Sequence, residues 1–206
     1  SMLWTNSGEV PGNGIDDDHD GIVDDVHGAD FVDRDGNPLD GNGHGTHVAG
    51  TVGAQAGNGI GVAGAAPQVK IMPVRFLDAS GSGYLSDAVS AIDFATTHGA
   101  KIMNNSWGGG GYSQALSDAI TRARTAGALF IAAAGNESNN NDTNPAYPAS
   151  YSQDNVLSVA ATDANDGLAS FSNYGSNNVD MGAPGVSILS TWPGGGYATL
   201  NGCLLY

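Results

Sequence analysis

The chain has 206 residues, of which 40% are hydrophobic and 32 are glycine, and its formal net charge is −15. This length can bury a sizeable core, and the composition favours a loop-rich α/β protein over a helical bundle. The negative charge argues against nucleic acid and anionic membranes as partners. No apolar run approaches the ~20 residues that span a bilayer. We expect one domain over residues 1–206, with an acidic region over residues 1–43.

The acidity is concentrated near the beginning of the chain, where ten of the 21 acidic residues lie between Asp16 and Asp40. The first group follows the pattern D-x-D-x-D-G, in which alternate carboxylates can turn inward on one hard cation. Position twelve is His27 rather than Glu, so only the first half resembles an EF-hand loop. Because six neighbouring aspartates repel one another, we interpret the group as a calcium loop rather than a solvated turn. Its predicted ligands are Asp16, Asp18, Asp20, the carbonyl of Ile22, and Asp24 or Asp25, of which we take Asp25.

The rest of the chain alternates short apolar runs with stretches of helical periodicity. Strands are predicted over residues 69–76, 101–105, 128–134, 156–161 and 188–191. Helices are predicted over residues 86–98, with Ser86 as N-cap and Gly99 as terminator, and 113–126. Residues 137–152 are predicted to form a surface loop. Buried strands that alternate with helices predict a three-layer α/β sandwich with a mostly parallel sheet. Functional loops are then expected at the carboxyl ends of the strands.

Three motifs occur in a fixed order along this pattern. Residues 42–50 read N-G-H-G-T-H-V-A-G, residues 131–137 read I-A-A-A-G-N-E, and residues 183–188 read A-P-G-V-S-I and lead to Asn201-Gly202. Together they resemble the subtilisin-like serine peptidases from about Trp4 to Gly202. The resemblance implies that His44, on a helix over residues 44–54, is the general base and that Asn136 donates to the oxyanion. His47, one turn further on, is interpreted as a hydrogen-bonded packing residue.

The resemblance also implies a cleft for an extended polypeptide substrate or peptide ligand, which would bind by strand addition. Taken alone, each of its two edges is only a glycine-rich loop. The predicted residues of the cleft are Ser106, Trp107 and Gly108 on one edge, Gly81, Ser82 and Gly83 on the other, and Ala133 and Gly135 beside Asn136.

A second acidic cluster precedes the histidine motif, and the resemblance implies calcium there as well. Its spacing, D-x-x-D-x-D-x-N, agrees with a calcium site that some members of the family carry at this place. A simple turn remains the alternative. The predicted ligands are Asp30, Asp33, Asp35 and Asn37. We expect calcium at both clusters to orient His44.

Two further features of the family pattern are not found in this sequence. The family continues Asn-Gly with Thr and the nucleophilic Ser, whereas Cys203 and Leu204 follow Gly202 here, and no strand with the catalytic Asp precedes Trp4. We therefore expect an inactive peptidase domain, truncated at both ends, with an incomplete core. The alternatives are a peptide-binding pseudoenzyme and a calcium-stabilised homo-oligomer that associates through exposed core surface. Cys203 is interpreted as an oxidation-prone free thiol rather than a nucleophile. The family implies secretion.

Overall fold

The computed structural model describes residues 2–203. Its helices are α1 (His44–Gly53), α2 (Leu85–Thr97), α3 (Gln114–Thr125) and the 3-10 turn η1 (Pro193–Gly195). Its strands are β1 (Ala29–Asp30), β2 (Val74–Arg75), β3 (Ile102–Asn105), β4 (Leu129–Ala133), β5 (Val156–Thr162), β6 (Met181–Pro184), β7 (Ile188–Trp192) and β8 (Gly196–Leu200). Strands β3, β4, β5 and β6 form a parallel sheet in that order. Strands β1 and β2 pair in parallel, whereas β7 and β8 form an antiparallel hairpin.

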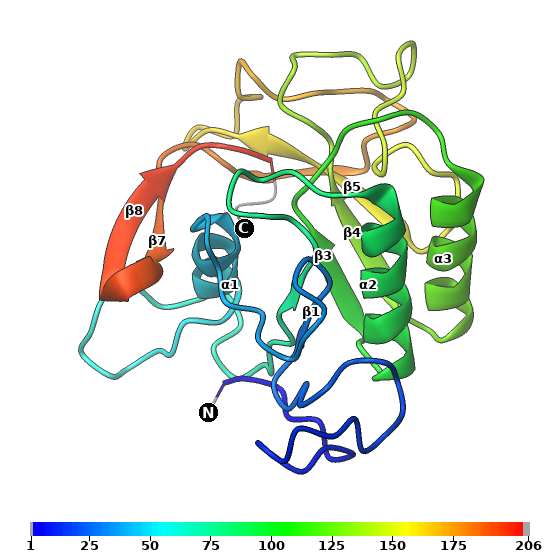
Figure 1. Ribbon diagram of the computed structural model, residues 1–206. Coiled ribbons are helices and arrows are strands. Elements are labelled where there is room, and N and C mark those ends of the chain that lie inside the picture. Colours follow the sequence, from blue (N-terminus) through cyan, green and yellow to red (C-terminus); the bar gives the residue numbers. More distant parts are fainter. Residues whose placement is uncertain (1, 204–206) are drawn as a thin grey trace.

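The elements are stacked in three layers (Figure 1). Helices α2 and α3 lie together on one side of the four-stranded sheet, and α1 lies on the other side beside the β7–β8 hairpin. Because α3 connects β3 to the neighbouring parallel strand β4, the chain crosses over through a helix, as parallel pairing requires. The predicted α/β fold with a mostly parallel sheet is therefore confirmed.

The best-packed part of the core lies between α3 and the sheet. The side chain of Ser113 accepts a hydrogen bond from the backbone N–H of Leu116 at 3.4 Å and so caps the first turn of α3. The apolar residues at helical spacing on α3 all face the sheet, as the sequence predicted, and they pack with Phe130 of β4, which is fully buried. Those residues of α3 are Leu116, Ala119, Ile120 and Ala123.

Several predicted boundaries are wrong. The strand predicted over residues 69–76 is regular only at Val74–Arg75, because Pro73 has no N–H to donate to a neighbouring strand. Helix α2 begins one residue before Ser86, and its N-cap is Tyr84, which makes no side-chain cap. Strands β1, β6 and β8 were not predicted at all.

One face of the parallel sheet is partly open to solvent. Alternate residues of β3 are exposed and buried, and on the exposed side Ile102 and, in β4, Leu129 are 65% and 37% accessible. Strands β2 and β3 are each the last strand of their sheets. Among residues 2–203, no helix is both long and apolar enough to cross a membrane.

Candidate active-site cleft

His44 is the first residue of α1, and the residues before it fix how the helix begins. Gly43 has φ 106°, in the left-handed region that favours glycine, and a Cβ atom there would collide with the Trp192 ring. The Asp40 carboxylate accepts hydrogen bonds from the N–H of Gly43 at 2.7 Å and from both the N–H and the hydroxyl of Thr46. The N-cap residue is Gly43, and Asp40 satisfies the N–H of Thr46 in the first turn of α1, a role that an Asp shortly before a helix could have signalled.

The surroundings of His44 favour its neutral form. Burial lowers the pKa of the half-buried His44 imidazole, the nearby His47 lowers the pKa further, and the Asp40 carboxylate opposes both. Within residues 2–203, no side chain forms a hydrogen bond with the His44 ring. A neutral imidazole can accept a proton, which is the protonation state that a general base needs.

We expect His44 to titrate below the ordinary histidine value of about 6.5, because burial disfavours its charged form. The folded chain then binds this proton less readily than the unfolded chain. His44 consequently leaves stability unchanged above about pH 6.5 and destabilises the fold as the pH falls below it. A titration of the histidine ring signals by NMR, with His44→Gln to assign the resonance, measures the midpoint. A midpoint at or above 6.5 would contradict the described environment.

His47 is fully buried and holds α1 against the β7–β8 hairpin. Its Nε2–H lies 3.1 Å from the carbonyl oxygens of both Ile188 and Ala198, which can only accept. In the other direction, the hydroxyls of Ser190 and Thr191 donate to backbone carbonyls of α1 at 2.7 and 2.8 Å. The prediction of a hydrogen-bonded packing residue is confirmed.

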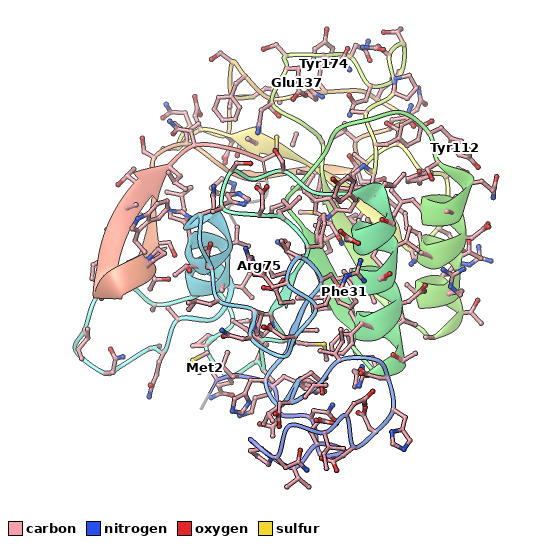
Figure 2. All side chains as sticks on the ribbon, in the orientation of Figure 1. Met2, Phe31, Arg75, Tyr112, Glu137 and Tyr174 are labelled. Carbon is pink, nitrogen blue, oxygen red and sulfur yellow. The ribbon has the colours of Figure 1, made fainter. Side chains whose placement is uncertain are left out.

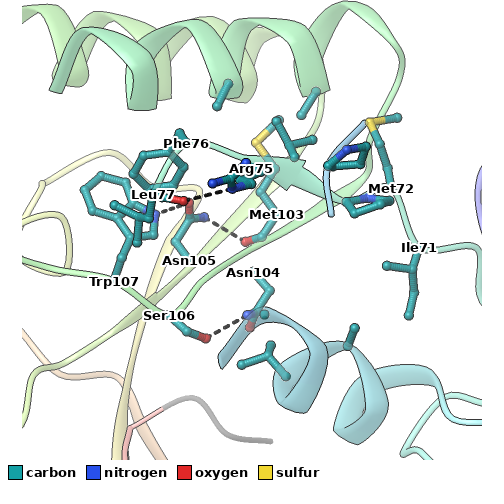
Figure 3. A pocket seen from close by; sticks show the side chains of 18 of the residues that line it. Ile71, Met72, Arg75, Phe76, Leu77, Met103, Asn104, Asn105, Ser106 and Trp107 are labelled. Carbon is teal, nitrogen blue, oxygen red and sulfur yellow. Dashed lines mark hydrogen bonds between the residues drawn. The ribbon is translucent and has the colours of Figure 1, made fainter. Parts of the chain in front are cut away.

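A large cavity of about 2420 Å³ brings together His44 and both predicted edges of the cleft. Every residue predicted for the two glycine-rich edges lines it, namely Gly81, Ser82, Gly83, Ser106, Trp107 and Gly108. Figure 3 shows the indole N–H of Trp107 donating to the Asn105 side chain, at 3.0 Å. The Asn105 amide in turn donates to the Met103 carbonyl at 3.0 Å, so the Trp107 ring is held at the carboxyl end of β3. Ala133, Gly135 and Asn136 are not among the residues that line this cavity.

Asn136 follows the carboxyl end of β4, after Gly135. Its side-chain oxygen accepts a hydrogen bond from the backbone N–H of Cys203 at 3.0 Å, and its amide nitrogen has no partner among residues 2–203. Figure 2 shows the next residue, Glu137, at the same end of the molecule as Tyr174. The Cys203 thiol is buried and donates to the Gly135 carbonyl at 3.0 Å. Cys203 is a free cysteine, as expected, but its burial disfavours the oxidation that was expected of it.

In the first acidic cluster, the carboxylates that lie close together are not the set that the calcium-loop pattern predicts. Asp25 is fully buried, whereas the carboxylate of Asp24 turns away and accepts from the N–H groups of residues 12–14. Asp16 accepts from the N–H of Gly21, within its own turn. Carboxylate oxygens of Glu9, Asp18 and Asp25 lie within 4.8 Å of one another. Glu9 was not predicted, since nothing in its local sequence shows that it folds back onto this loop.

Burial of negative charge in this first cluster is energetically unfavourable. Burial raises the pKa of Asp25 to about 6, although hydrogen bonds from the Asn6 amide at 2.9 and 3.0 Å favour the ionised form. The three convergent carboxylates supply the oxygen ligands that calcium prefers. The described residues thus supply part of a calcium ligand set, and the Asn6 amide, which donates to both Asp18 and Asp25, would have to turn away from the ion.

In the second acidic cluster, the positive charge comes from a side chain of the protein, Arg75. The Arg75 guanidinium pairs with the buried carboxylate of Asp30 and, at 2.8 Å, with the exposed carboxylate of Asp33. Asp35 accepts from the backbone N–H of Asn37 at 2.9 Å. Figure 2 shows Arg75 in the middle of the molecule, between α1 and α2. Within residues 2–203, the three aspartates of this cluster do not converge as a metal-sized group.

The fold agrees with that of known proteins. A model of the subtilase family matches residues 9–203. The chain belongs to the subtilase family of serine peptidases.

Several named proteins are similar to this chain. Thermitase from Thermoactinomyces vulgaris is 48% identical, over 86% of this chain and 61% of the relative. A thermophilic serine proteinase from Bacillus sp. (strain AK1) is 46% identical, over 92% and 46%, and subtilisin DY from Bacillus licheniformis is 46% identical, over 86% and 64%. The crystal structure of a cold adapted subtilisin-like serine proteinase superimposes with a TM-score of 0.77 at 40% identity, over 86% of this chain and 62% of that one. The chain thus spans less than two thirds of these relatives.

Proposed function

We propose that the chain forms the peptide-binding cleft of a secreted serine endopeptidase. The observation that carries this proposal is the shared cavity, which His44 lines together with both glycine-rich edges. An extended polypeptide would lie between the edges and form backbone hydrogen bonds with them. In the hydrolytic reaction His44 would take the proton from the nucleophile, and the free amide of Asn136 would donate to the oxyanion.

We further propose that the 206-residue chain binds peptides without cleaving them. A serine peptidase needs a carboxylate to orient its histidine, and no carboxylate of residues 2–203 hydrogen-bonds to the His44 ring. In the sequence, Leu204 stands where the family pattern has the nucleophilic Ser, and it lies outside the described residues. The proposed activity of this chain is therefore binding through the cleft.

The cleft predicts a sharp difference between a glycine that lines it and a glycine that does not. A valine at Gly108 would enter the edge where the peptide pairs; its Cβ lies an ordinary 3.5 Å from the Tyr147 carbonyl, so the fold tolerates it. We expect Gly108→Val to weaken binding of a fluorescent extended peptide at least about 10-fold by polarisation, a change of about 1.4 kcal/mol. Gly196→Val is the control, because Gly196 is exposed, does not line the cavity, and a Cβ atom there would lie 4.0 Å from the Cβ of Trp192. Equal affinities for both variants would remove Gly108 from the cleft.

We propose calcium as the ion that stabilises the acidic region. The oxygen-only group of Glu9, Asp18 and Asp25 would hold it and gain compensation for its buried charge. Asp16, Asp20 and the Ile22 carbonyl stay predicted neighbours of this ion. Calcium at the second cluster also stays a prediction, and there it would have to compete with Arg75.

A second candidate function is assembly, which the exposed sheet face favours. Ile102 and Leu129 lie on neighbouring strands and are accessible, and association would cover them. We propose a homo-oligomer through this surface. Light scattering coupled to size-exclusion chromatography tests it, and a monomer at all concentrations would contradict it.

A further inference from the structure

His98, directly after α2, has a ring whose proton is placed by its neighbours. Its Nδ1 lies 2.9 Å from the carbonyl oxygen of Phe94, four residues earlier. A carbonyl oxygen can only accept, so Nδ1 carries the hydrogen in this contact. In the neutral imidazole the other nitrogen, Nε2, then presents a lone pair.

That lone pair faces two carboxylates from the acidic loop. Nε2 of His98 lies 3.5 Å from an oxygen of Asp18 and 3.5 Å from an oxygen of Asp20. The three atoms lie within 4.8 Å of one another, although the loop and the histidine are about 80 residues apart in the sequence. A positive charge between three such acceptors would stabilise them, and it can be either a proton on Nε2 or a metal ion.

The distances favour a metal ion over a proton. A charged N–H···O hydrogen bond is about 2.7–2.9 Å long, and both contacts of His98 are much longer. Ligands about 2.1 Å from a tetrahedral ion are about 3.4 Å apart, which is close to the observed spacing. The hydrogen bond from Nδ1 to a backbone carbonyl is also the contact that orients most metal-binding histidines.

The site is held firmly and can be reached from solvent. The His98 ring packs against Phe94 at a centroid distance of 4.2 Å and against the edge of Trp4 at 5.4 Å, which fixes its orientation. The side chains of Asp18, Asp20 and His98 keep 22%, 17% and 13% of their surface accessible. The stretch from residue 1 to residue 33 contains neither Lys nor Arg, so the loop brings no cation of its own.

We propose that Asp18, Asp20 and His98 form a three-ligand site for a divalent transition-metal ion such as Zn²⁺, with the remaining position open to water. The site shares Asp18 with the oxygen-only group of Glu9, Asp18 and Asp25. Its imidazole nitrogen distinguishes it from that group, because nitrogen ligands suit zinc and cobalt rather than calcium. The ion ties the acidic loop to the end of α2. This proposal does not depend on the peptidase function.

Calorimetric titration of the full chain with Zn²⁺, after chelation and in calcium-free buffer, tests the proposal. We expect one Zn²⁺ to bind, and His98→Gln to weaken binding at least about 10-fold, since losing even an outer partner of a metal ligand costs about 10- to 100-fold. His27→Gln is the matched control, because His27 also donates through Nδ1, to the Trp4 carbonyl at 2.8 Å, but belongs to no described metal group. It should bind Zn²⁺ as the parent does.

Two further measurements test the proposed ligands independently. Co²⁺ should give the intense visible absorption of a four-coordinate ion, and both His98→Gln and the loop variant Asp20→Asn should lose it. Stabilisation by calcium should persist in His98→Gln, which separates this site from the proposed calcium site. Absence of Zn²⁺ binding, or binding that is the same in His98→Gln and His27→Gln, would overturn the proposal.

Discussion

Replacing Arg75 by Met is expected to lower the free energy of unfolding by about 3–5 kcal/mol, because it leaves a buried carboxylate without its cation. Asp30 is fully buried, and within residues 2–203 its carboxylate accepts from the backbone N–H groups of Val32 and Asp33 but from no side chain except Arg75. Methionine keeps most of the volume of the arginine stem, so the loss measures the charge rather than a cavity. Guanidinium unfolding of the two proteins gives the difference.

The double variant Asp30→Asn with Arg75→Met is the control for this prediction. A neutral amide costs much less to bury than an unpaired carboxylate, so the second change should restore most of the lost stability. Adding calcium to both proteins tests the second cluster further. If the second cluster binds this ion, calcium should stabilise Arg75→Met more than the parent. A single variant as stable as the parent would show that Asp30 and Arg75 do not depend on each other.

Removal of calcium is expected to have the second large effect. At a concentration one hundred times its Kd, an ion that binds only the folded chain stabilises it by about 2.7 kcal/mol. Asp25→Asn should abolish this stabilisation, because it neutralises the one fully buried carboxylate of the group. Without calcium the variant should be at least as stable as the parent near pH 7, since the amide carries no buried charge. Thermal unfolding with calcium and with chelator measures both effects.

Asp118→Asn serves as the control for calcium. Asp118 lies on α3, outside the described metal groups, and accepts from Gln114 at 2.8 Å on the surface. Its variant should respond to calcium as the parent does. A calcium response that survives in Asp25→Asn would remove Asp25 from the ligands.

The parts of the fold that follow from local pattern were predicted well. Helix α3 has its cap, its apolar face and its terminating Gly127 within one short stretch, and the structure uses all three. Strand β6 reads M-G-A-P, which has little intrinsic preference for a strand. It is a strand only because β5 lies beside it and pairs with it, and a single sequence does not show such a neighbour.

The site shows the same division between local and long-range causes. The motif around His44 and the glycine-rich edges could be recognised from their local sequence, and the structure gathers them at one cavity. The acidic clusters depend on residues far along the chain. Arg75 reaches back to Asp30, 45 residues earlier, and His98 joins a loop about 80 residues before it. Spacing within each cluster could predict the carboxylates but not these partners.

The most direct test of the proposed function is a peptide assay on the purified 206-residue chain, in parallel with His44→Ala. One sample measures binding of a fluorescent extended peptide, and a second measures its cleavage. We expect binding in both proteins and no cleavage above background in either, because His44 has no carboxylate partner among residues 2–203. Cleavage by the parent chain that disappears in His44→Ala would contradict this account.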